Sequence, residues 1–121
     1  MHKVQGNIAE AKALLHFTEM GYCISKPVFE NTPYDFVIDN GCKLYRVQVK
    51  SSRCLEGPSY RLELRTKGGA GNAQEVKRAD SSNCDLLFAT TPEASYIIPV
   101  EVFDGKGRIM LGDRYKEYMV R

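Results

Sequence analysis

The sequence lacks any long apolar run: no stretch of its 121 residues approaches the roughly 18 apolar residues of a membrane-spanning helix. Its N-terminus also lacks a basic segment followed by an apolar stretch, the pattern of a secretory signal. With 43% hydrophobic residues, the chain can still build one core. We therefore expect a soluble, cytoplasmic protein with a single domain over residues 1–121.

Paired cysteines and a strong net charge are missing as well. The four cysteines are scattered, with no C-x-x-C pair, which favours reduced thiols and argues against a zinc site. The net charge is only +2, so bulk electrostatics neither require nor exclude a nucleic-acid partner. No internal repeat, low-complexity tract or linker divides the chain. Basic residues nevertheless concentrate in its middle third, at Arg53, Arg61, Arg65, Lys67, Lys77 and Arg78.

Hydrophobic periodicity predicts an α/β fold. A first helix is predicted over residues 7–20, where Ile8, Ala11, Leu15 and Thr18 recur on one side. Further short helices are predicted over 74–82 and after Asp113. Alternating or apolar runs predict strands over 22–28, 34–39, 43–51, 60–66, 86–90, 95–103 and 108–111.

The connections between these strands predict how they pair. Asn40-Gly41 predicts a two-residue hairpin, which makes strands 34–39 and 43–51 antiparallel neighbours. The nearly all-apolar strand 86–90 predicts a buried central position. Together these features predict a mixed, mainly antiparallel central sheet flanked by helices.

Polar residues of chemical interest lie on the two strands of this hairpin. Asp35 stands at the head of one strand, while Gln48 and Lys50 share one face of the next, because side chains two apart point the same way. Glu10 lies upstream on the predicted helix. Such carboxylate and amide oxygens could hold a divalent metal against a phosphodiester, since Mg²⁺ takes few protein oxygens and keeps its water and phosphate ligands.

The pattern Pro33-x-Asp35 followed by Gln48-x-Lys50 resembles the PD-(D/E)XK nuclease superfamily. Residues 34–39 (YDFVID) and 47–51 (VQVKS) are similar to its group I intron-encoded homing endonucleases. The archaeal Holliday junction resolvases share the architecture and a glutamate on the first helix, which would match Glu10. The resemblance covers roughly residues 5–103. It implies a restriction-endonuclease-like core in the order αβββαβ and a Mg²⁺-dependent DNA endonuclease that acts as a homodimer or higher homo-oligomer, with Mn²⁺ as a possible substitute.

The resemblance also implies roles for individual residues. Asp35, Glu10 and Gln48 would hold the metal, and Lys50 would assist the attack of water. Gln48 stands where most of the superfamily has a carboxylate, although the homing branch tolerates glutamine, so metal affinity should be weaker than with a glutamate. DNA contacts are expected from the strand end and the basic stretch, at Ser51, Ser52, Arg53, Arg65, Lys67, Lys77 and Arg78.

Other interpretations of the same residues stay open. Glu10 lies three positions after Asn7, as in a capping box. Asp35 could be a turn residue, and Gln48 and Lys50 could be the solvated side of a half-buried strand. At the level of function, the alternatives are a Holliday junction resolvase, a catalytically inactive nuclease fold that binds DNA or protein, and a plain interaction module.

Overall fold

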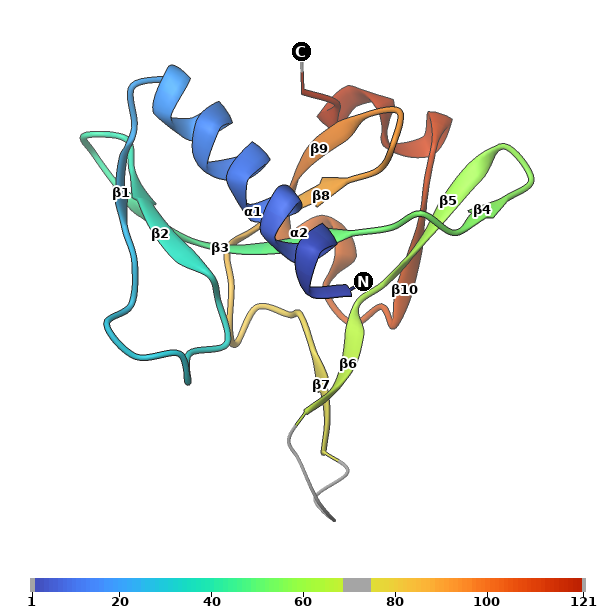
Figure 1. The fold of residues 1–121 in the computed structure, drawn as a ribbon, viewed down its shortest axis with the longest axis horizontal. Helices are drawn as coiled ribbons and strands as arrows, with labels where there is room; N and C mark the ends of the chain where they lie inside the picture. Colours follow the sequence, from blue (N-terminus) through green and yellow to red (C-terminus); the bar gives the residue numbers. More distant parts are fainter. Residues whose placement is uncertain (1, 69–74, 121) are drawn as a thin grey trace.

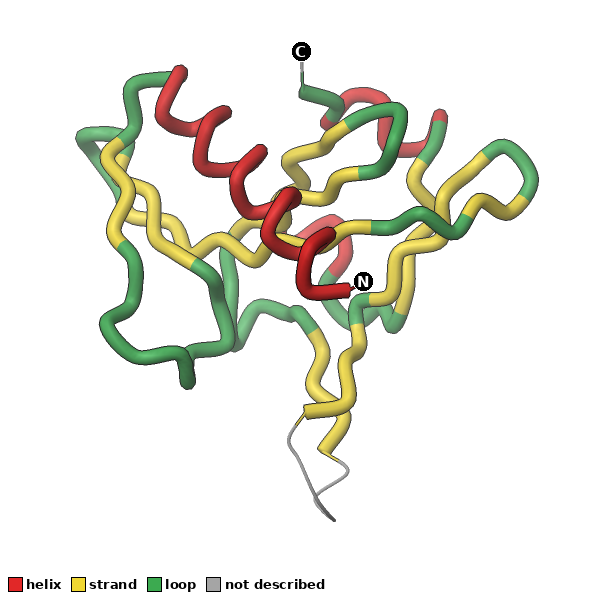
Figure 2. Tube along the Cα trace, viewed as in Figure 1, coloured by secondary structure: helices red, strands yellow, loops and turns green. Residues whose placement is uncertain are grey.

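One long helix lies across a twisted sheet, and a second, smaller sheet packs beyond it (Figure 1, Figure 2). The computed structural model describes residues 2–68 and 75–120. Its helices are α1 (His2–Glu19), α2 (Val100–Phe103) and the 3-10 helix η1 (Asp113–Tyr118). Its strands are β1 (Cys23–Ser25), β2 (Phe36–Asp39), β3 (Leu44–Ser51), β4 (Leu55–Glu56), β5 (Ser59–Glu63), β6 (Arg65–Gly68), β7 (Glu75–Arg78), β8 (Leu86–Thr90), β9 (Ser95–Pro99) and β10 (Arg108–Leu111).

The central sheet has the strand order β1-β2-β3-β8-β9. All of its pairs are antiparallel except β3 with β8, which run parallel. The predicted α/β class with a mixed, mainly antiparallel sheet is therefore confirmed. The apolar strand β8 is nearly fully buried between β3 and β9, as its composition predicted. Within the described ranges, no helix is long and apolar enough to cross a membrane.

Helix α1 packs on one face of this sheet, but not through the apolar row that its sequence suggested. Ile8 is 51% exposed and Leu15 is 59% exposed. The buried side consists of Ala9, Ala13 and Phe17 instead. The alanines let the helix approach a sheet face that already carries large side chains, and Ala13 and Phe17 join a core of Phe36, Ile38, Val47 and Phe88.

The small sheet, with the order β10-β5-β4, covers the opposite face of the central sheet. Its apolar side chains meet those of β8 and β9 in a second core that includes Leu62, Ile109, Leu87 and Ile98. Leu62 and Leu64 are both buried, as the alternation over 60–66 predicted.

The helix predicted over residues 74–82 is wrong. Strand β7 (Glu75–Arg78) occupies the first part of this segment and pairs antiparallel with β6, in a hairpin that projects from the body of the molecule (Figure 1). A turn follows, in which Asp80 Oδ1 accepts the N–H of Ser82 at 2.9 Å and Asn83 Oδ1 accepts the N–H of Asp80 at 3.1 Å. These short polar side chains compete with helical hydrogen bonding. Gln74 lies outside the described residues.

Other element boundaries also differ from the prediction. The strand predicted over 60–66 is divided between β5 and β6, which belong to different sheets. Strand β1 covers only Cys23–Ser25 of the range 22–28. Strand β9 ends at Pro99, which then serves as the N-cap of α2, because proline has no N–H to continue the strand ladder. The β2–β3 turn centres on Gly41 and Cys42, one residue later than predicted, because the N–H of Asn40 donates to the carbonyl of Lys43 at 3.2 Å.

Candidate active site

Asp35 is fixed where the β2–β3 ladder ends. Phe36 is paired with Val47, and the N–H of Asp35 donates to the Val47 carbonyl at 2.9 Å. Beyond Val47, β3 has no further pairing with β2, so its backbone needs another partner. The Asp35 side chain provides one, since Oδ2 accepts the backbone N–H of Val49 at 2.7 Å. The same oxygen also accepts an N–H of the Gln48 side-chain amide at 3.1 Å. The carboxylate thus continues the strand ladder by one hydrogen bond.

Glu10 reaches the same place from helix α1. It lines a cleft together with Asp35 and Lys50. The helix begins at His2, so Glu10 belongs to its third turn and the capping-box interpretation with Asn7 is wrong. Oε1 of Glu10 lies 3.0 Å from Nζ of Lys26, in an ion pair that joins α1 to the segment after β1.

Lys50 and Gln48 lie on β3 and connect this cleft to a second one. The second cleft has Gln48 and Lys50 between the segments 30–33 and 78–83. Lys50 lines both clefts and is half-buried. The structure therefore brings Glu10, Asp35 and Lys50 to one cleft, with Gln48 held against the Asp35 carboxylate.

The electrostatics of the cluster follow from burial and from mixed charge. Burial raises the pKa of Asp35, the N–H of Val49 opposes this, and the negative charge of Glu10 raises it further. The positive charges of Lys50 and Lys26 act in the opposite direction. Burial also lowers the pKa of Lys50, against the attraction of Asp35. Two carboxylates and two ammonium groups therefore compensate one another within a partly buried site.

The donor set fits a hard divalent cation. Among the described residues, no group of three or more His, Cys, Asp or Glu side chains could hold a metal. The candidate metal ligands of the site are all oxygen atoms. Both hydrogen bonds found for the Asp35 carboxylate use Oδ2, which leaves Oδ1 available. Gln48 donates through its amide nitrogen, so its carbonyl oxygen is available too. Oxygen donors of low total charge suit a cation that keeps water and phosphate ligands, as Mg²⁺ does.

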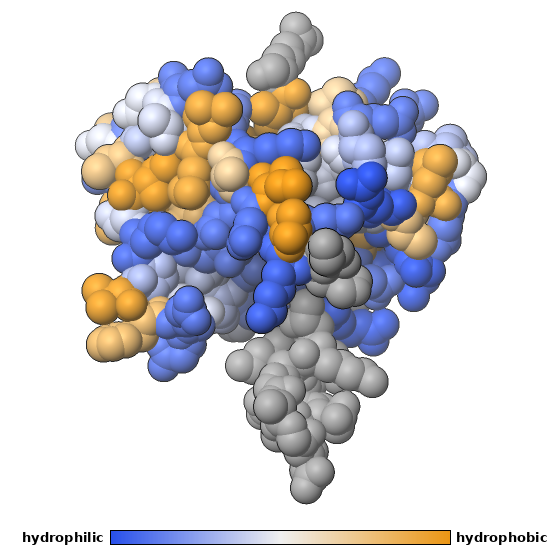
Figure 3. Space-filling view, viewed as in Figure 1, coloured by the Kyte–Doolittle hydropathy of each residue, from blue (hydrophilic) through white to orange (hydrophobic). Residues whose placement is uncertain are grey.

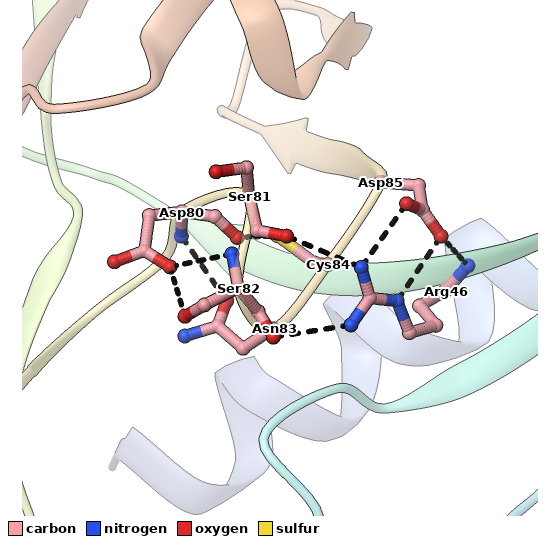
Figure 4. Close-up of polar contacts among 7 residues, drawn as sticks. All are labelled: Arg46, Asp80, Ser81, Ser82, Asn83, Cys84 and Asp85. Atoms are coloured by element: carbon pink, nitrogen blue, oxygen red, sulfur yellow. Dashed lines mark hydrogen bonds and ion pairs between the residues drawn. The ribbon is translucent and has the colours of Figure 1, made fainter.

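An ion pair on the same face of β3 as Gln48 and Lys50 has no local signal in the sequence. Nε and Nη2 of Arg46 donate to the two carboxylate oxygens of Asp85 at 3.1 and 3.2 Å (Figure 4). The backbone N–H of Arg46 also donates to Oδ2 at 2.8 Å. The guanidinium further donates to the carbonyls of Ser81 and Ser82. This network, which we call the Arg46 clamp, holds the turn after β7 against β3.

The expected DNA-contacting residues fall into three groups. Ser51 and Arg53 border clefts beside the site. The hydroxyl of Ser52, by contrast, is buried and donates to the carbonyl of Arg61, so it serves the fold. The remaining residues lie on the β6–β7 hairpin, namely Arg65, Lys67, Lys77 and Arg78.

Arg65 and Arg78 occupy directly opposed positions at the base of this hairpin. Like charges that face each other across a strand pair are destabilising. Here both side chains contact the turn between α2 and β10: Arg65 packs against Gly107, while Arg78 donates to the carbonyl of Gly105 at 3.2 Å. Arg78 also lines the second cleft beside Gln48 and Lys50.

The fold and the cluster of Glu10, Asp35 and Lys50 define a nuclease with a restriction-endonuclease-like architecture. A family model described as PD-(D/E)XK endonuclease matches residues 1–112. The chain belongs to the PD-(D/E)XK endonuclease family. Nucleases of this family typically depend on a divalent metal.

Among solved structures, the chain is similar to a bacterial homing endonuclease, I-Ssp6803I. The two share 27% sequence identity with a TM-score of 0.81, over 97% of this chain and 87% of that one. No curated protein matches the chain. The predicted family, fold class and homing-endonuclease-like endonuclease activity are thereby confirmed.

Proposed function

We propose that this endonuclease hydrolyses DNA phosphodiester bonds with Mg²⁺ bound by Asp35 and Glu10. The carbonyl oxygen of Gln48 would be a neutral third ligand or would position a water. One observation carries the proposal: the Asp35 carboxylate is fixed by the N–H of Val49 at 2.7 Å, in a cleft that Glu10 and Lys50 also line.

The bound metal would supply charge neutralisation on the phosphate and a more acidic water. The protein would hold the reactants around it. Asp35 is preorganised, because its position follows from the β2–β3 register and not from a flexible side-chain choice. The lowered pKa of Lys50, caused by burial, suits a group that exchanges a proton with water or neutralises charge in the transition state.

The second cleft offers a path for the DNA. Its floor carries Gln48 and Lys50. One wall comes from the segment 30–33 before β2, and the other from Arg78 at the end of β7 and the residues that follow it. The β6–β7 hairpin projects beside this cleft, with Lys67 and Lys77 on its two strands (Figure 1). Basic residues along such a path would pair with phosphates and make binding dependent on salt.

Cutting both DNA strands needs more than one copy of a chain that carries one site, and we propose self-association through α1. Val4, Ile8 and Leu15 are each at least half exposed on one stripe of this helix. Apolar side chains gather over α1 on the face seen in Figure 3. An exposed apolar stripe of this kind is typical of an interface between proteins.

Sedimentation velocity tests this association. The unmodified protein should sediment as a dimer or larger species, and Leu15→Glu should shift it towards the monomer. Leu55→Glu is the matched control, because Leu55 is 55% exposed but lies on β4 and not on α1. A monomer for the unmodified protein at the concentrations used for cleavage would contradict the proposal.

The catalytic assignment is tested with supercoiled, linear and branched DNA, each with Mg²⁺, with Mn²⁺ or with chelator. Cleavage should require the metal. Asp35→Ala and Lys50→Ala should each lower it about a hundredfold or more while DNA binding stays largely intact. Asp39→Ala and Lys43→Ala are matched controls at the far end of the same hairpin, and both should cut normally.

Two results would change the proposal. If both site variants still cut, the assigned residues are wrong. Preference for four-way junctions over linear duplex would favour a junction-resolving role for the same chemistry.

A further inference from the structure

Lys26 contacts the site from an element that the family motif does not include. It follows directly after β1, and its ammonium lies 3.0 Å from Oε1 of Glu10. The Lys26 side chain is 53% exposed and that of Glu10 is 29% exposed. Such an exposed ion pair contributes little to the stability of a fold. The stability of the fold therefore does not depend on this pair.

The charge of Lys26 acts on both acids of the site. It contacts Glu10 directly, and it also lowers the pKa of Asp35, opposing the effect of Glu10 on that group. Lys26 thus lies near enough to the two carboxylates to offset their mutual repulsion. Its positive charge therefore neutralises part of the negative charge that a metal ion shared by Glu10 and Asp35 would neutralise.

We propose that Lys26 is an exchangeable counter-ion of the metal site: it neutralises Glu10 in the absence of metal and must leave Glu10 before a divalent cation binds there. The inference rests on the proposed function, because it takes Glu10 and Asp35 as the metal-binding acids. The long, flexible lysine side chain can move away at little cost, since it is already about half exposed.

The competition has a consequence for metal affinity. Every divalent ion that binds through Glu10 displaces an attractive partner and then experiences the repulsion of a nearby ammonium. Lys26 therefore weakens metal binding and raises the metal concentration at which the enzyme becomes active. If Lys26 instead served only to orient Glu10, removing it would weaken metal binding, so the two roles predict opposite signs.

Calorimetric titration of the full chain with Mn²⁺, without DNA, tests the inference. Lys26→Met should bind Mn²⁺ more tightly by roughly two- to fivefold, the size expected for one charge near the protein surface. Lys26→Arg keeps the charge and should stay close to the unmodified protein. Lys12→Met is the matched control, because Lys12 lies on the same helix two residues from Glu10 and does not line the cleft of the acids.

A further pair of variants locates the effect. In the Glu10→Gln background, Lys26→Met should give a smaller gain, because the ion pair is already lost and only the repulsion between the ammonium and the metal is removed. Equal or weaker Mn²⁺ binding by Lys26→Met overturns the inference alone, if the unmodified protein binds Mn²⁺. Absence of Mn²⁺ binding in every variant overturns the metal site itself, and the inference with it.

Discussion

The two acids of the site are held in opposite ways. Asp35 is fixed by the sheet: its backbone pairs with Val47 and its carboxylate accepts the N–H of Val49. Glu10 is held by a helix on one side and by a single ion pair with exposed Lys26 on the other. The sheet side of the site is thus preorganised by backbone hydrogen bonds, whereas the helix side can rearrange through one side chain.

This difference shows how a small nuclease can combine one acid of fixed position with another that can move. The group whose position depends on strand register can define where the scissile phosphate lies. The group on the helix can adapt to the ligand that arrives. We therefore expect substitutions on the two sides to fail in different ways.

The largest expected contrast is between Asp35→Asn and Glu10→Gln. Asp35→Asn should lower the rate of plasmid nicking about a hundredfold at every metal concentration, because it removes a charge at the fixed centre. Glu10→Gln should instead raise the Mn²⁺ concentration for half-maximal nicking about tenfold, since fewer ligand charges weaken the binding of a hard cation. The measurement is a metal titration of nicking rates.

This contrast between the two acids would be contradicted if high Mn²⁺ restored the nicking rate of Asp35→Asn as well as that of Glu10→Gln. Both acids would then act only through their charge, and the fixed position of Asp35 on β3 would not contribute to the cleavage rate. Melting temperatures of the two variants should be recorded beside the rates, because Asp35 also accepts two hydrogen bonds from β3.

A smaller effect should follow from the Arg46 clamp, which lies on β3 next to Gln48. Asp85→Ala removes the acceptor of three hydrogen bonds from Arg46 and should cost about 1 to 2 kcal/mol of unfolding free energy. Glu63→Ala breaks the exposed ion pairs with Arg61 and Arg108 and should change that free energy by less than about 0.5 kcal/mol. Urea denaturation measures both, and equal effects would mean that the clamp is only a surface ion pair.

The sequence predicted those parts of the site that depend on local pattern. The Asn40-Gly41 signal and the alternation on either side of it were enough to pair β2 with β3, and this pairing places Asp35 near Gln48 and Lys50. Residue type and order at these positions were enough to indicate nuclease chemistry. The metal-binding and catalytic roles of the individual residues stay predictions.

Features that depend on distant contacts could not be predicted in this way. The buried side of α1 is set by the large side chains of the sheet beneath it, which is why Ala9 and Ala13 face inward while Ile8 does not. The β6–β7 hairpin replaced a predicted helix because the pairing of the two strands outweighed local preference. Lys26 meets Glu10, and Arg46 meets Asp85, across separations that carry no periodic signal.

The β2–β3 turn, far from the chemistry, acquires an unexpected importance from the way Asp35 is attached. A shift of one strand past the other by a single residue would turn its side chains to the opposite face of the sheet. The Val49 N–H would then no longer lie opposite the Asp35 carboxylate. The number of residues in the turn is therefore a property of the active site, although none of them touches it. Its composition can change as long as this length is kept and a glycine stays at Gly41, whose φ of +93° disfavours any other residue.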